Sequence, residues 1–164
     1  MLLLSLAANS AHASEYTEIQ RLANAGQTHL ALVRVEKGIA QNPKDPQLRF
    51  LQGVIQADSG MVDAAEQTFI ALTRLYPELP EPYNNLAALY AKSNRFGKAR
   101  EALESALRLN PNYAVAHENL GDVYARLAAE SYASAQQLDQ TNPRLAPKLT
   151  LARQLLNGAA VTPQ

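Results

Sequence analysis

The chain has 164 residues, of which 47% are hydrophobic and 18% charged, so it is too apolar for a disordered protein and fits one compact domain. Its 15 basic and 15 acidic side chains balance, so no net charge attracts it to nucleic acid or to an anionic membrane. The absence of cysteine excludes disulfides, thiolate metal sites and a cysteine nucleophile.

The first 13 residues, MLLLSLAANSAHA, have the character of a secretory signal. They carry no Lys, Arg, Asp or Glu, open with an apolar run and end with the small-residue pattern of Ala11 and Ala13. We expect cleavage between Ala13 and Ser14, which makes the mature protein periplasmic or secreted. The run is too short to span a bilayer, and no membrane insertion of the mature chain is expected. Because no cation precedes the run, the signal would be a clipped one. The alternative is a helix that packs on the rest of the chain, and the protein would then act in the cytoplasm.

Three sets of residues recur with a period of 34. One set ends each repeat with proline: Pro43, Pro77 and Pro111. A second set is a small residue: Ala31, Ala65, Ala99 and Ala133. The third set is Gly26, Gly60, Asn94 and Ala128. Agreement in phase among the three sets predicts a stack of similar units, each burying its apolar face on its neighbours.

Each unit reads as two helices. In the third unit, Leu86 and Tyr90 are four residues apart on one face. After a break at residues 93–94, Ala99 and Leu103 mark the apolar stripe of a second helix. Pro111 ends the unit, because proline lacks an N–H and disfavours helix in the residue before it.

A resemblance to the tetratricopeptide repeat family is strongest in two segments, PYNNLAALYAKSNRFGKAREALESALRLNP (82–111) and AVAHENLGDVYARL (114–127). Together with the signal-like N-terminus, it leads us to expect an exported bacterial member of this family. Both segments carry the family's Leu, small residue and Tyr on the first helix. The longer segment adds the family's aromatic, Ala, Leu, Ala and Pro on the second. The resemblance implies an all-α, right-handed α-solenoid of about four helix pairs plus a C-terminal capping helix.

The resulting units are repeats at about 14–45, 46–79, 80–113 and 114–143, a cap at 144–157 and a flexible tail at 158–164. Two of them depart from the family pattern. In the first helix of the first repeat, Glu18 and Ile19 replace Leu and a small residue, so this helix is expected to be short or loosely held. In the fourth repeat no Gly or Asn marks a turn near Leu127. We interpret SYASAQQLDQ as a separate, shortened second helix, with one long continuous helix as the alternative. The proline-rich stretch 76–82 is interpreted as a stiff spacer that fixes the angle between the second and third repeats.

Catalytic motifs are missing. The sequence has no glycine-rich phosphate loop and no nucleophile elbow. His117–Glu118 begins like the zinc-protease H-E-x-x-H motif, but Gly121 stands where the second histidine is needed. We therefore expect no catalytic residue, no metal site, no cofactor and no enzymatic activity.

The family resemblance implies that the first helix of each repeat lines a concave groove, and helical spacing predicts which side chains face it. The predicted partner-binding residues are Tyr16, Phe50, Val54, Asn84, Lys92, Glu118, Asp122 and Arg126. Gln20, Asn24, Asp58 and Ala88 complete the four trios. Asn85 and Asn119 are expected to bond to the backbone of a neighbouring repeat.

The expected function is a non-catalytic scaffold or adaptor that binds a peptide or helix of another envelope protein in this groove. The alternative is a self-associating structural module that uses the apolar region of Phe50 and Val54 to form a homo-oligomer. The sequence does not identify the partner.

Overall fold

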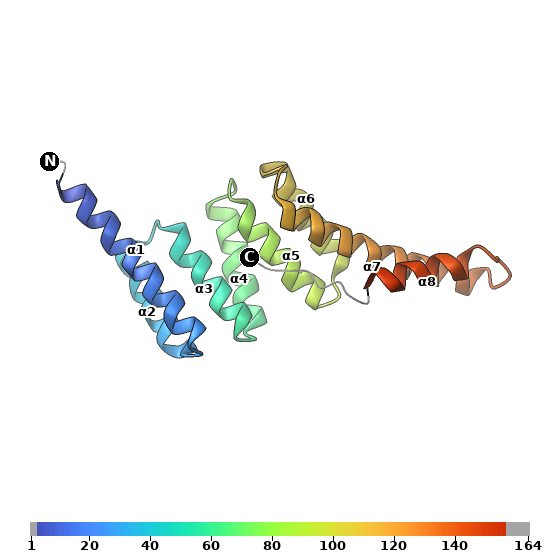
Figure 1. Cartoon of the computed structure of the whole chain (residues 1–164), viewed down its shortest axis with the longest axis horizontal. Coiled ribbons are helices and arrows are strands. Elements are labelled where there is room, and N and C mark those ends of the chain that lie inside the picture. The colour runs from blue at the N-terminus through green and yellow to red at the C-terminus, as the bar shows by residue number, and fades with distance from the viewer. Residues whose placement is uncertain (1–2, 157–164) are drawn as a thin grey trace. The chain divides into compact units, whose positions relative to one another are not determined.

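The computed structural model describes residues 3–156, with side chains described from Ser14 onward. This part of the chain is all-α and contains no strand, which confirms the expected fold class. It divides into two compact units, α1–α4 and α5–α8, with the boundary between Tyr76 and Pro77 (Figure 1).

The N-terminal unit consists of two helix pairs, α1 (Leu3–Asn24) with α2 (Thr28–Gln41) and α3 (Pro46–Asp58) with α4 (Val62–Leu75). Successive helices pack on each other, and α1 also contacts α3. Seven buried side chains from α1, α2 and α3 form one core cluster: Ile19, Leu22, Ala31, Val35, Leu48, Leu51 and Ile55. The expectation that the first helix would be short or loosely held is wrong, because α1 has 22 residues and Ile19 is fully buried. The predicted cleavage position between Ala13 and Ser14 lies within α1 and stays a prediction.

The C-terminal unit begins with the pair α5 (Pro80–Lys92) and α6 (Phe96–Leu109). Ala99, Leu103 and Ala106 of α6 are fully buried, and the small residues Ala31 and Ala65 are fully buried in the N-terminal unit. Their burial confirms that the 34-residue period marks close helix contacts in the first three repeats, whereas Ala133 of the fourth repeat is only half-buried. Pro80 and Pro82 belong to the first turn of α5, where proline is tolerated, so the stretch between helices is shorter than the predicted spacer.

The turns between paired helices explain the glycine and asparagine positions. Gly26, Gly60 and Asn94 have φ values of +71°, +77° and +56°. This left-handed region is open to glycine and accessible to asparagine, but it is costly for other L-residues. Each of these residues lies two positions after the first helix of its pair ends, and the second helix of the pair begins two positions later.

The fourth repeat does not form two helices. At Ala128, the next position of this period, the chain stays helical, and α7 (Ala114–Leu138) runs unbroken for 25 residues. The preferred prediction of a separate helix over SYASAQQLDQ is therefore wrong, and the alternative of one long helix is correct. Alanine has the highest helix propensity and enters the left-handed region only at a cost, so Leu127–Ala128–Ala129 continues the helix.

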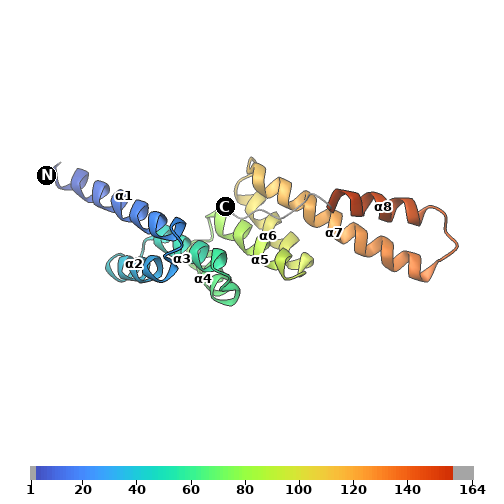
Figure 2. The ribbon, with the colours of Figure 1, turned by 60° about the horizontal axis from the view of Figure 1, so that its bottom comes forward.

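The last helix, α8 (Leu145–Leu156), lies back along the C-terminal half of α7, as both views show (Figure 1 and Figure 2). Leu149 and Ala152 are buried in this contact, whereas the buried residues of α7 itself lie in its first half. The expected capping helix is thus present but covers the extended half of α7 rather than a complete fourth pair. The predicted flexible tail lies outside the described residues.

Candidate protein-binding surface

The predicted groove residues of the N-terminal unit lie on α1 and α3. We call Tyr16, Gln20, Asn24, Phe50, Val54 and Asp58 the α1/α3 face. Gln20, Asn24 and Asp58 are exposed or partly exposed, whereas Tyr16, Phe50 and Val54 are half-buried. The face therefore offers polar groups to solvent and places its larger apolar groups partly inside the unit.

Tyr16 links the first repeat to the second. Its hydroxyl donates a hydrogen bond to Oδ2 of Asp45, while Oδ1 of the same carboxylate accepts the backbone N–H of Gln47 at 2.9 Å and caps α3. Burial, together with this bond to a negative group, raises the pKa of Tyr16 to about 12. Tyr16 thus holds α1 on the start of α3, a structural role that the sequence did not predict.

Phe50 also has a structural contact. Its ring lies 5.8 Å from the ring of Phe69 at 59°, a tilted arrangement favourable for aromatic pairs. Phe50 is therefore only partly accessible, because one side of its ring packs on Phe69 of α4. Val54, one turn further along α3, keeps part of its side chain accessible.

On the C-terminal unit, the predicted residues lie on α5 and α7. We call Asn84, Ala88, Lys92, Glu118, Asp122 and Arg126 the α5/α7 face. The prediction that Asn84 lines the binding surface is wrong, because its side chain is fully buried. Its Oδ1 accepts a 2.8 Å hydrogen bond from Nδ2 of Asn119. It joins α5 to α7 and is not available to orient a partner.

The charged residues of this face remain accessible. Lys92, Glu118 and Arg126 are exposed, and the guanidinium of Arg126 lies 6.0 Å from the centre of the Phe96 ring, which positions it. Burial and the charge of Glu118 raise the pKa of Asp122, and Arg126 partly opposes this shift. Two cations and two carboxylates are therefore presented along α5 and α7.

The contacts of two residues of this site were not predicted from sequence. Asn119 was expected to bond to backbone of a neighbouring repeat, and its Nδ2 donates to the Asn84 side chain of that repeat. Its periodic equivalent Asn85 does bond to backbone, at 3.0 Å, but to the carbonyl oxygen of Glu81 in its own helix. Phe96 was the second, because the cation on its ring is Arg126, 30 positions later in the chain, and no local pattern relates the two residues.

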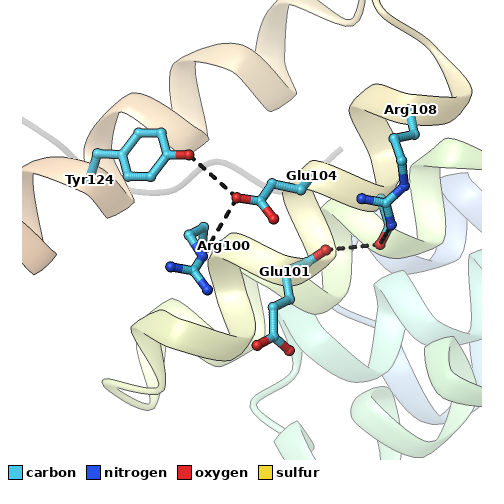
Figure 3. Close-up of polar contacts among 6 residues, drawn as sticks. Arg100, Glu101, Glu104, Arg108 and Tyr124 are labelled. Carbon is cyan, nitrogen blue, oxygen red and sulfur yellow. Dashed lines mark hydrogen bonds and ion pairs between the residues drawn. The ribbon is translucent and has the colours of Figure 1, made fainter.

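A second polar cluster lies along α6 and reaches α7 through Tyr124 (Figure 3). Glu104 forms an ion pair with Arg100 at 3.5 Å, and its Oε1 accepts a 3.4 Å hydrogen bond from the hydroxyl of Tyr124. Arg108 donates to the Ser105 hydroxyl at 2.8 Å. Glu104 thus links α6 to α7 through Tyr124, while the Arg108–Ser105 contact stays within α6 and the buried Nε of Arg100 has an ion pair but no hydrogen-bond partner.

Among the residues that the structure describes, no three His, Asp or Glu side chains come together as a metal site. His117 Nε2 lies 2.9 Å from the carbonyl oxygen of Pro111, a local contact at the start of α7. Within residues 3–156, no helix has the length and apolar character needed to cross a membrane.

Solved structures with the same fold include a tetratricopeptide protein of Thermus thermophilus, TTC0263, at 25% identity and a TM-score of 0.64, covering 88% of this chain and 82% of that one. PilF of Pseudomonas aeruginosa matches at 17% identity and a TM-score of 0.65, covering 91% and 70%. The first tetratricopeptide domain of Spaghetti (RPAP3), solved with the HSP90 peptide SRMEEVD, matches at 19% identity and a TM-score of 0.64, covering 71% and 92%.

Two family models match the sequence itself. A model described as "Tetratricopeptide repeat" matches residues 16–80, and one described as "TPR repeat" matches residues 89–127. Together they account for well over half of the chain and for both compact units. This protein belongs to the tetratricopeptide repeat family.

Proposed function

We propose that this protein is a non-catalytic adaptor that binds a peptide or helix of another protein through the α1/α3 and α5/α7 faces. The observation that carries the proposal is the division of side chains on α5 and α7. Their packing residues are buried, while Lys92, Glu118 and Arg126 on the same helices are exposed and charged. Packing does not require these charges, and they suit recognition of a complementary segment.

The two faces would contribute differently. The α5/α7 face would select charge, with Lys92 and Arg126 meeting carboxylates and Glu118 with Asp122 meeting cations. The α1/α3 face would add apolar contact through Val54 and the accessible edge of Phe50. Peptide binding by a structural relative, the first domain of Spaghetti, supports this class of function for the fold.

The cellular location is part of the proposal. The apolar run and the Ala11 and Ala13 pattern support export to the periplasm or beyond, so the partner would be another envelope protein. Expression in the native host should then yield exported protein that begins at Ser14. An intact N-terminus on cytoplasmic protein would instead place the same adaptor in the cytoplasm.

The binding proposal is tested by charge reversal with a matched control. Lys92→Glu with Arg126→Glu should abolish capture of the native partner, identified by affinity purification and mass spectrometry from the host. The control, Arg74→Glu with Arg108→Glu, reverses two exposed cations on α4 and α6 and should leave capture intact. Equal capture by both variants would contradict the proposal.

Self-association remains the competing function, and light scattering distinguishes it. An adaptor stays monomeric when purified, whereas a structural module gives a stable oligomer. Val54→Asp would dissociate an oligomer formed through the α1/α3 face.

A further inference from the structure

The last helix has two different sides. Leu149 and Ala152 of α8 are buried, but Leu151 and Leu155 are 62% and 68% exposed. Leu151 and Leu155 are four residues apart, and Lys148 precedes Leu151 by three, so helical spacing places all three along one side of α8. We call Lys148, Leu151 and Leu155 the α8 edge.

The exposed leucines are not needed for the contact with α7. The α7–α8 contact already buries Leu149 and Ala152, and the α8 edge adds two large apolar side chains that solvent reaches. Leucines four residues apart form an apolar strip along one side of a helix, and such a strip can pack on the apolar side of a partner helix. In the views of Figure 1 and Figure 2, α8 lies along the extended half of α7, and among the described helices it packs on α7 alone.

The charge of the segment indicates what kind of helix it would receive. Residues 140–156 carry Arg144, Lys148 and Arg153 and no Asp or Glu. Lys148 belongs to the α8 edge itself, and its ammonium lies 5.6 Å from the centre of the Tyr132 ring on α7, a contact that positions the charge. The nearest carboxylates in sequence are Glu130 and Asp139, both on α7 or at its end.

We propose that the α8 edge binds an acidic amphipathic helix of a partner protein, with leucine-like side chains against Leu151 and Leu155 and a carboxylate against Lys148. A second copy of this chain fits less well, because two α8 edges would bring cations together with no carboxylate from residues 140–156. An α-helix of 12 residues is about 18 Å long, so a little over three turns of the partner helix would cover it. This site is separate from the α1/α3 and α5/α7 faces and does not depend on their function.

The test uses a defined probe and the full-length chain. A fluorescein-labelled 16-residue peptide is designed as a helix, with Leu at positions i, i+3, i+4 and i+7 and Glu at the flanking positions. Fluorescence anisotropy should show binding of this peptide, and a peptide with Lys in place of each Glu should bind at least about tenfold more weakly.

Two sets of variants assign the binding to the edge. Leu151→Gln with Leu155→Gln should weaken binding of the Glu peptide at least about tenfold, because both leucines would be covered in the complex. The matched control is Leu30→Gln with Val33→Gln, which removes two exposed apolar side chains from α2 and should leave binding unchanged. Lys148→Glu should reverse the preference between the Glu and Lys peptides. Far-ultraviolet circular dichroism should show the same helix content for all of these proteins.

The alternatives give distinct results. Equal binding of the Glu and Lys peptides, or equal loss in the α2 control, would overturn the proposal. Binding of the chain to phosphatidylserine vesicles that requires Leu151 and Leu155, without binding of the Glu peptide, would assign the edge to a lipid surface instead. The Lys92→Glu/Arg126→Glu variant should still bind the Glu peptide, and loss of binding there would assign the peptide to the α5/α7 face.

Discussion

Substitution of Gly53 by alanine should destabilise the protein although it improves helix propensity. Gly53 lies in α3, where a Cβ atom would stand 2.7 Å from Cε1 and 2.8 Å from Cζ of Phe69. Carbon atoms normally pack about 3.5 to 4.0 Å apart, so the ring would have to move. Phe69 is fully buried and also packs against Phe50, which leaves it little room to do so.

The magnitude follows from two opposing effects. Overpacking of a buried contact costs about 1 to 3 kcal/mol, and replacement of a helical glycine by alanine returns about 0.5 to 1 kcal/mol. The difference is a net loss of up to about 2.5 kcal/mol for Gly53→Ala, with a central value of about 1 kcal/mol. Gly121 is the matched control: it lies inside α7, is exposed, and has nothing within 4 Å of its Cβ position. Gly121→Ala should therefore stabilise the protein by about 0.5 to 1 kcal/mol.

Urea unfolding followed by circular dichroism measures both variants under the same conditions. The prediction is a change of opposite sign, with the midpoint lowered for Gly53→Ala and raised for Gly121→Ala. Two stabilised variants would show that α3 and α4 do not approach closely at Gly53, and the packing described for the second repeat would then be wrong.

Three further predictions concern single contacts. Because the folded-state pKa of Tyr16 is about 12 against an ordinary value of 10.0, its contribution to stability is complete below pH 10 and is lost as pH rises to 12. Tyr16→Phe should reduce the loss of unfolding free energy over that pH range, and an unchanged pH profile would contradict the Tyr16–Asp45 bond. Asn119→Ala should lower the free energy of unfolding by about 1 to 3 kcal/mol, because it removes a buried donor to Asn84. The double variant with Asn84→Ala should lose less than the sum of the two single variants. Simple additivity in urea unfolding would refute the coupling. Ala128→Gly should open the left-handed conformation within α7 and speed amide exchange around residue 128 more than Ala129→Gly does, and equal exchange in the two variants would refute the account of the missing turn.

The parts of the fold that follow the 34-residue period could be predicted from sequence. Ala31, Ala65 and Ala99 recur because each lies where two helices approach closely, so the packing requirement is repeated in the sequence itself. The turns at Gly26, Gly60 and Asn94 were predictable for the same reason, since each needs a residue that tolerates positive φ. The continuous α7 had a sequence signal as well, alanine at position 128, but the expectation of a regular repeat outweighed it.

The binding faces were less predictable because burial is decided by neighbouring helices. The i, i+4 rule placed Asn84 with Lys92 on one side of α5, but it could not show that α7 covers one end of that side and leaves the other exposed. The Phe50–Phe69 contact and the Tyr16–Asp45 bond likewise join residues 19 and 29 positions apart, which no local pattern relates. The exposed charges Lys92, Glu118 and Arg126 were identified correctly as accessible, and their role in binding stays a prediction.

The central claim, that partners bind the α1/α3 and α5/α7 faces, is tested most directly by site-specific photo-crosslinking in the native host. A photoreactive amino acid replaces Val54 or Glu118 on these faces, and Gln67 on α4 or Glu101 on α6 serves as the exposed control. Val54 and Glu118 should give adducts with one and the same protein, and the two controls should not. Adducts of equal yield at all four positions, or adducts from Gln67 and Glu101 alone, would contradict this claim.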